Sequence, residues 1–186
     1  MKKALLLVLL LGAAALADAD TPDRYDPEAA LQLSQQAIGR SLGDYVLTDE
    51  FGQPVNLRRD YAGKPLVISL IFTSCHHVCP ATTKHLAKAV DVAREALGAD
   101  SFNVVTIGFD VANDTPQAMA AFARRQGVKD ENWRFLSADS ESILKISNDL
   151  GFIFFPTPRG FDHLNQSSVI DRNGAVYSQV YGVTFE

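Results

Sequence analysis

The stretch Pro65-Leu-Val-Ile-Ser-Leu-Ile-Phe-Thr-Ser-Cys-His-His-Val-Cys-Pro80 decides the fold, because an apolar run leads directly into both cysteines of the chain. Residues 66–72 are apolar and rich in β-branched side chains, which is typical of a central strand covered on both faces. Proline is tolerated in the first turn of a helix, where its missing N–H needs no partner. Pro80 therefore predicts a helix, with Cys79 at or next to its N-terminus and Cys75 in the loop before it.

The position and spacing of the two cysteines favour sulfur chemistry. The dipole and the free N–H groups of a helix N-terminus favour thiolate over thiol. Side chains at i and i+4 of a regular helix have Cβ atoms ~5–6 Å apart, whereas a disulfide needs roughly 3.5–4.5 Å, so a disulfide requires the loop to bend. A metal ion accepts a wider separation, and thiolates select copper(I) or zinc over harder ions. Cys75 and Cys79 are thus candidate ligands of a soft metal.

Composition narrows the class of protein. A chain of 186 residues can bury the core of one domain without disulfide staples. Both of its cysteines lie in a single motif, which indicates a functional pair rather than a folding framework. The formal net charge is −5, which argues against a nucleic-acid partner.

Residues 1–17 have the features of a secretory signal peptide: a basic start, an apolar stretch from Ala4 to Ala17 and an Ala15-Leu16-Ala17 cleavage signal. The apolar part is shorter than the ~20 residues of a membrane-spanning helix. We expect an exported chain that begins near Asp18 and has no membrane span, with tethering to the membrane as the alternative if the signal is not cleaved. Cleavage leaves 15 basic and 22 acidic residues, a net charge of −7.

The remaining sequence alternates between helical and strand patterns. A polar lead and short helix occupy residues 18–38, and further helices are expected from 80 to about 97, from 116 onward, and over 140–150 before Gly151. Strands are expected over 66–72, 102–109 and 133–136, with hairpins over 45–57 and at 167–170 with 176–181. This order predicts an α/β, thioredoxin-like fold over residues 39–186, with an N-terminal hairpin and a C-terminal β-hairpin.

Three motifs together resemble the Sco/SenC family of copper-binding thioredoxin-like proteins. They are Cys75-His-His-Val-Cys79-Pro80, then Asp110 with Asp114-Thr115-Pro116, and finally Asp162-His163 ahead of the hairpin at 169–174. The resemblance covers residue 38 to the C-terminus.

For the metal site, the resemblance implies that Cys75, Cys79 and His163 bind one copper ion, as Cu(I) or Cu(II). It further implies a periplasmic metallochaperone that helps to mature the binuclear copper centre of cytochrome c oxidase. Its partner is then the copper-centre subunit of the oxidase or another exported thiol protein.

The chain departs from the common family pattern at three places. Most members have Pro-Asp between the cysteines, where this chain has His76 and His77, and Val111 stands where a proline usually follows the aspartate. The sequence stops at Glu186, without the final helix that the family places after the last strand. We therefore interpret the domain as truncated at its C-terminal end and expect one face of the sheet to be less well covered.

A second function uses the same two cysteines. In a thiol–disulfide oxidoreductase, Cys75 or Cys79 attacks a partner disulfide and the other cysteine resolves it. His163 separates the two functions, because an imidazole lets a dithiol site hold the cupric ion too, whereas disulfide exchange does not need it. A structural disulfide is a weaker alternative, because closing so short a ring restrains the unfolded chain little. A structural zinc ion is also weaker, since three ligands leave its tetrahedron incomplete.

The other polar candidates also have ordinary structural interpretations. Asp162 need not orient the ring of His163, because neighbours in an extended segment point to opposite sides. Asp110 can simply end a strand, and Asp114 with Thr115 can cap a helix. Solvated surface positions are the default interpretation of the remaining histidines, His76, His77 and His85.

Overall fold

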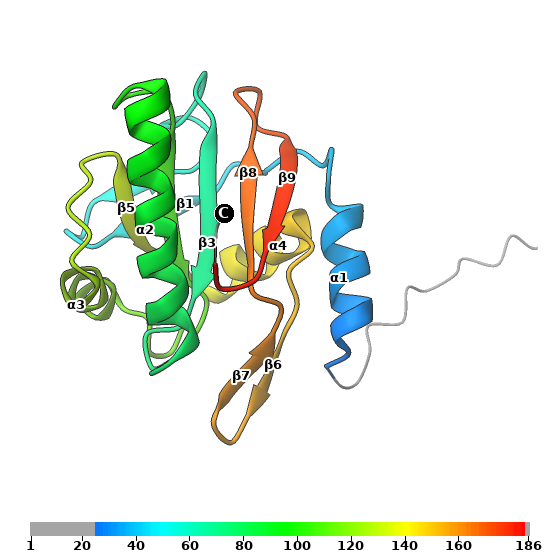
Figure 1. The fold of residues 1–186 in the computed structure, drawn as a ribbon. Coiled ribbons are helices and arrows are strands. Elements are labelled where there is room, and N and C mark those ends of the chain that lie inside the picture. Colours follow the sequence, from blue (N-terminus) through cyan, green and yellow to red (C-terminus); the bar gives the residue numbers. More distant parts are fainter. Residues whose placement is uncertain (1–24, 185–186) are drawn as a thin grey trace, which may run out of the picture.

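A mixed seven-stranded sheet forms the centre of the computed structural model, which describes residues 25–184 (Figure 1). The strand order is β2-β1-β5-β4-β3-β8-β9. Neighbouring strands β3, β4 and β5 are parallel, and the other pairs are antiparallel. The strands are β1 (Val46–Asp49), β2 (Pro54–Asn56), β3 (Leu66–Ile71), β4 (Asn103–Gly108), β5 (Trp133–Ser137), β8 (Gln166–Ile170) and β9 (Val176–Tyr181).

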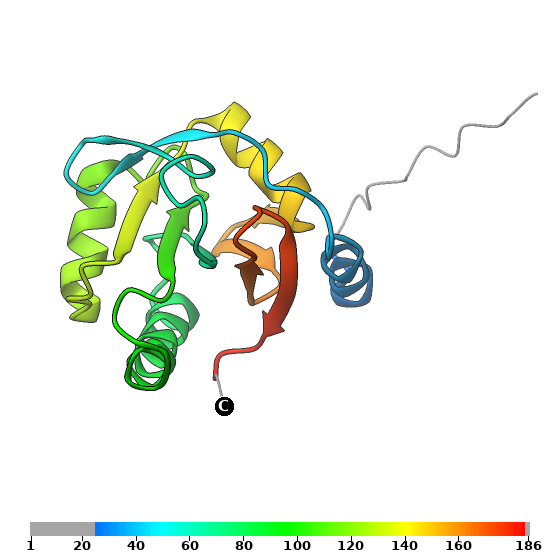
Figure 2. The ribbon, with the colours of Figure 1, turned by 90° about the horizontal axis from the view of Figure 1, so that it is seen from above.

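Helices cover both faces of this sheet. The four helices are α1 (Pro27–Gln36), α2 (Val78–Leu97), α3 (Pro116–Gln126) and α4 (Ser140–Leu150). Helices α2 and α3 lie on one face and α4 on the other, while α1 lies beside the edge strand β9 (Figures 1 and 2). The hydroxyl of Tyr181 on β9 is hydrogen-bonded to that of Ser34 on α1 at 3.0 Å. The predicted α/β thioredoxin-like arrangement with its two hairpins is therefore confirmed.

Residues 65–80 form the middle of the core, as predicted. Strand β3 pairs with β4 on one side and β8 on the other, and five of its six residues are buried. Helix α2 begins at Val78, so Pro80 lies in its first turn. The central strand and the helix after it were predictable because both patterns are local: a short apolar run, then a proline that only a helix start accommodates.

One hairpin was not predicted. Strands β6 (Phe154–Thr157) and β7 (Gly160–His163) form a separate two-stranded sheet that projects from the main body (Figure 1). Its sequence contains Pro156 and Pro158, and proline within a run argues against a strand because it cannot donate to the ladder. The hairpin places His163 opposite Phe154 in the register.

An apolar hollow of about 380 Å³ lies between α2 and strands β3, β8 and β9. Its lining includes Val67, Leu86, Val90, Val169 and Val180.

The signal peptide predicted for residues 1–17, like the polar lead up to residue 24, lies outside the described residues. Within the part that the structure describes, no helix combines the length and apolar character needed to cross a membrane.

Candidate metal and thiol site

The loop between β3 and α2 brings the two cysteines together. Cys79 is buried in the first turn of α2, and Cys75 is half-buried in the loop. The backbone N–H of Cys79 donates to Cys75 Sγ at 3.3 Å. His77, at the N-cap position, makes no side-chain capping bond. The sulfur of Cys75 therefore occupies the acceptor position that a side-chain oxygen usually takes at a helix start.

The two sulfurs differ in protonation because they share one hydrogen bond and are buried to different extents. A hydrogen bond from the Cys79 side chain is the largest of the effects that lower the pKa of Cys75 from 9.0 to about 5, and backbone N–H groups of residues 77–79 add to it against the effect of burial. The same shared hydrogen bond, followed by burial, raises the pKa of Cys79. At neutral pH the pair thus consists of an accessible thiolate at Cys75 and a buried thiol at Cys79.

Alkylation by iodoacetamide should reveal this asymmetry. Because the pKa of Cys75 is lowered to about 5, its rate should rise as the pH passes that value and be level well below pH 9.0. Mass spectrometry of the folded protein would assign the modified cysteine, with urea-unfolded protein as the control, whose thiols should react with a midpoint near ~8.5. A folded profile that matches the unfolded one would contradict the assignment.

His163 stands at the end of β7 in an aromatic setting. Its ring centroid lies 5.3 Å from that of Phe109, 5.5 Å from that of Phe152 and 6.0 Å from that of Phe72. Burial lowers the pKa of the imidazole, which favours the neutral ring. Nδ1 lies 3.1 Å from the carbonyl oxygen of Leu164. A carbonyl only accepts, so Nδ1 carries the proton and donates to it, which leaves the lone pair on Nε2 available to a metal ion.

Cys79 and His163 face a common cavity, which Cys75 does not line. Cys79 and His163 both line a small cavity with room for about one water molecule, and the charge of Cys75 acts on the pKa of His163. Among residues 25–184, however, no three His, Cys, Asp or Glu side chains are already grouped closely enough to hold a metal ion. The structure thus joins Cys75 with Cys79 and places His163 on a neighbouring wall, but it does not assemble all three donors.

The donor set suits a soft metal. One thiolate, one thiol that metal binding can deprotonate, and one neutral imidazole with a free Nε2 are the ligand types that copper prefers over harder ions. Mg²⁺ and Ca²⁺ prefer oxygen ligands. The residues present therefore fit copper in either oxidation state.

The remaining candidate residues lie at the surface, on a helix or at a helix cap. His76 and His77 are exposed, His85 is half-buried on α2, and Asp162 is exposed on the side of β7 opposite to the ring of His163. Thr115 caps α3 by accepting from the N–H of Ala118 at 3.3 Å.

The predicted cap role of Asp114 is wrong, because its carboxylate turns inward to Thr73 in the cysteine loop. The contact between Asp114 and Thr73 could have been predicted from the order of the strands in the sheet. Thr73 and Asp114 follow β3 and β4 in the chain, and the carboxyl ends of neighbouring parallel strands meet at one edge of a sheet.

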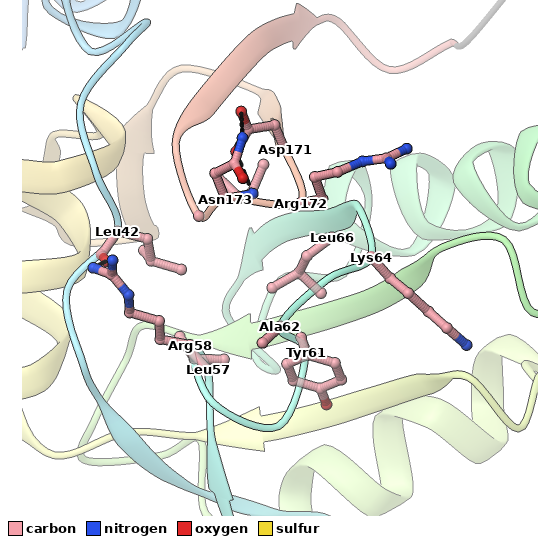
Figure 3. A pocket seen from close by; sticks show the side chains of 12 residues that line it. Leu42, Leu57, Arg58, Tyr61, Ala62, Lys64, Leu66, Asp171, Arg172 and Asn173 are labelled. Carbon is pink, nitrogen blue, oxygen red and sulfur yellow. Dashed lines mark hydrogen bonds between the residues drawn. The ribbon is translucent and has the colours of Figure 1, made fainter.

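A second hollow, of about 80 Å³, lies at the opposite end of β3, between the β2–β3 connection and the β8–β9 turn (Figure 3). Arg58 there donates to the carbonyl oxygen of Leu42 at 3.1 Å. The charged ends of Lys64 and Arg172 extend away from the hollow in Figure 3. Its polar groups do not converge on a ligand, so we assign it no function.

The SCO1/SenC family model matches residues 34–183. The SCO1 protein homolog of Bacillus subtilis (strain 168) is 28% identical over 145 residues, which are 75% of this chain and 72% of the relative. The mitochondrial SCO2 homolog of Bos taurus is 28% identical over 147 residues, or 78% of this chain. The chain spans only 51% of the length of that mitochondrial relative.

Solved structures of Sco proteins are also similar to this chain. A SCO1/SenC family lipoprotein from Bacillus anthracis is 28% identical with a TM-score of 0.69, over 77% of this chain and 85% of that one. ScoI of Bradyrhizobium japonicum, solved with copper bound, is 26% identical with a TM-score of 0.61, over 80% and 91% of the two chains. BsSco, a member of the Sco family of cytochrome c oxidase assembly proteins, has the same fold, with 21% identity and a TM-score of 0.69 over 78% and 85%.

Proposed function

Because the chain belongs to the SCO1/SenC family, we propose that it is a copper-binding metallochaperone whose ligands are Cys75, Cys79 and His163. The observation that carries this proposal is the donor set. A Cys75 thiolate at the start of α2 lies next to the Cys79 thiol, and the aromatic wall beside them presents a neutral imidazole. Two thiolates suit the cuprous ion, and the imidazole extends the site to the cupric ion.

Copper is the cargo in this function, and the chain's own residues set how it is held. Cys75 offers a charged sulfur without further deprotonation, and Cys79 gives up its proton when metal binds. The hydrogen bond from Nδ1 of His163 to Leu164 fixes the tautomer. The rings of Phe72, Phe109 and Phe152 limit water at the imidazole. We propose that the recipient is the copper-centre subunit of cytochrome c oxidase, since BsSco belongs to a family of assembly proteins for that enzyme.

Anaerobic copper titration before and after oxidation tests this function. The reduced protein should bind one equivalent of copper, whereas protein with a Cys75–Cys79 disulfide should bind poorly, because oxidation removes two of the three ligands at once. Stoichiometry can be read by competition with a chromophoric chelator, with reduction of the same oxidised sample as the control. Equal copper binding in both states would move the site to His76, His77 or His85.

A second candidate function is thiol–disulfide exchange, and the difference between the two sulfurs favours it. An accessible thiolate is the attacking group and a nearby buried thiol the resolving group. In this function, Cys75 attacks a partner disulfide and releases one partner thiolate. Cys79 then loses its proton, attacks the mixed disulfide and releases the second. The partner gains the two electrons that the dithiol loses.

We also propose that the protein is exported to the periplasm. The support is the signal-like sequence of residues 1–17 and the lipoprotein character of the relative from Bacillus anthracis. The intact mass of the exported protein should correspond to a chain that begins near Asp18. A mass that retains residues 1–17, recovered from a membrane fraction, would favour tethering instead.

A further inference from the structure

A buried carboxylate lies behind the cysteine loop. Asp114 is 2% exposed, and none of the ion pairs formed by residues 25–184 involves it. Its Oδ1 accepts from the backbone N–H of Thr73 at 2.8 Å and from the Thr73 hydroxyl at 2.7 Å, and its Oδ2 accepts from the N–H of Asp110 at 2.9 Å. Burying a carboxylate without a cation is costly unless hydrogen bonds replace its water. These three bonds supply that replacement.

Two of the three bonds join two loops of the functional edge, and the third, from Asp110, lies within the loop after β4. Thr73 follows β3 and precedes Cys75 by two residues, and Asp110 follows the neighbouring parallel strand β4. The N–H of Cys75 donates to the carbonyl oxygen of Phe72 at 3.1 Å, so residues 72–75 form a tight turn with Thr73 inside it. Asp114 is therefore bonded to the turn that leads into Cys75.

The surroundings of Asp114 are shaped for this contact. A Cβ built on Gly108 would lie 2.9 Å from Oδ2 of Asp114, closer than real Cβ contacts allow, so glycine at this position leaves room for the carboxylate. Asp114 is also close enough to Cys79 for its charge to act on that thiol. The carboxylate is thus buried behind the cysteine loop and contacts it through Thr73.

We propose that Asp114 is the positioning residue of the dithiol: through Thr73 it holds the turn at residues 72–75, which keeps the two sulfurs open for copper and disfavours their closure into a disulfide. The metal part of this inference rests on the proposed copper function. Its hydrogen bonds reach the dithiol through Thr73, and Asp114 is not itself a proposed copper ligand. The carboxylate has two acceptor oxygens for three donors, which an amide cannot match.

Asp114→Asn tests this role, because the shape of the side chain changes little while one oxygen becomes an NH₂ group. That NH₂ group would face an N–H donor and could not accept its hydrogen bond. We expect at least about tenfold weaker cuprous binding, an altered charge-transfer spectrum of the cupric form, and an equilibrium with oxidised glutathione shifted about tenfold toward the protein disulfide. In that equilibrium the two cysteines lose two electrons and the proton of Cys79, and one glutathione disulfide takes up these electrons, that proton and one proton from water to become two glutathione thiols.

Asp49→Asn is the matched control. Asp49 is also a buried carboxylate, 5% exposed, and accepts from the N–H groups of Phe51 and Gln53, but it lies on β1, beyond β4 and β5 from the cysteine strand. The Asp49→Asn substitution should lower the melting temperature without changing the copper spectrum or the glutathione equilibrium. Thr73→Val removes only the hydrogen bond of the hydroxyl. It should shift the copper spectrum and the glutathione equilibrium in the same direction as Asp114→Asn does, by a smaller factor. Thr73→Ser keeps the hydroxyl and should restore the parent values.

Three results would overturn the proposal: a folded Asp114→Asn protein with the parent spectrum and equilibrium, an Asp49→Asn protein that shifts them equally, or a Thr73→Val protein indistinguishable from Thr73→Ser. The last comparison decides the matter if Asp114→Asn does not fold. If the parent itself binds no copper, the metallochaperone function fails, whereas the glutathione equilibrium still reports on the position of the sulfurs. The two failures are therefore distinguishable.

Discussion

Replacing either Cys75 or Cys79 by serine should weaken cuprous binding by more than about 100-fold, since changes that only touch the outer shell of a metal site already cost 10–100-fold. Serine keeps the size of the side chain but exchanges a soft sulfur for a hydroxyl that the cuprous ion does not favour. The measurement is competition with a chromophoric cuprous chelator under anaerobic conditions. Circular dichroism would verify that each variant is folded.

The adjacent histidines supply the control for this experiment. His76 and His77 lie between the cysteines and are exposed, so a double alanine variant perturbs the same loop without removing a proposed ligand. It should bind cuprous ion as the parent does. If the double variant loses as much affinity as the serine variants, the histidine pair belongs to the cuprous coordination set, and the assignment of cuprous binding to the two sulfurs is wrong.

Replacing His163 by alanine should separate two activities in one molecule. Cupric binding should fall sharply, because the imidazole is the only proposed nitrogen ligand, while the two sulfurs retain much of the cuprous binding. Disulfide exchange should continue, since neither the attacking nor the resolving sulfur is changed. The cupric charge-transfer absorption and the rate of reaction with oxidised glutathione measure the two effects on the same sample.

His85→Ala is the matched variant for this substitution. His85 is half-buried on α2 and is not a proposed ligand, so its loss should leave both readouts unchanged. A His163→Ala protein with unchanged cupric affinity and absorption would refute the three-ligand site. Disulfide exchange would then be the leading function of the cysteine pair.

Much of the fold was predictable because its signals are local. The apolar run of β3, the proline in the first turn of α2 and the glycine after α4 each act on a few consecutive residues. The hairpin of β6 and β7 escaped prediction because the prolines in its sequence oppose a strand, and its stability comes from aromatic contacts such as that of Phe161 with Phe72. Such contacts join residues far apart in the chain, which periodicity does not reveal.

The same distinction applies to the site. The position of the cysteines at a helix start followed from the sequence, and the structure places them there. The link between Asp114 and Thr73 crosses from one βα loop to the next, so it depends on which strands are neighbours. Whether His163 closes on the two sulfurs stays a prediction, because the described residues do not bring the three donors into one group.

The protonation states of the three proposed ligands set the proton balance of copper loading. At neutral pH Cys75 has already lost its proton, and His163 has a free lone pair on Nε2. Cys79 alone retains a proton that the metal must displace. Loading then releases about one proton per copper ion, so affinity changes about tenfold per pH unit rather than the hundredfold of two ordinary thiols. A carrier of this kind keeps its cargo through modest acidification of its surroundings.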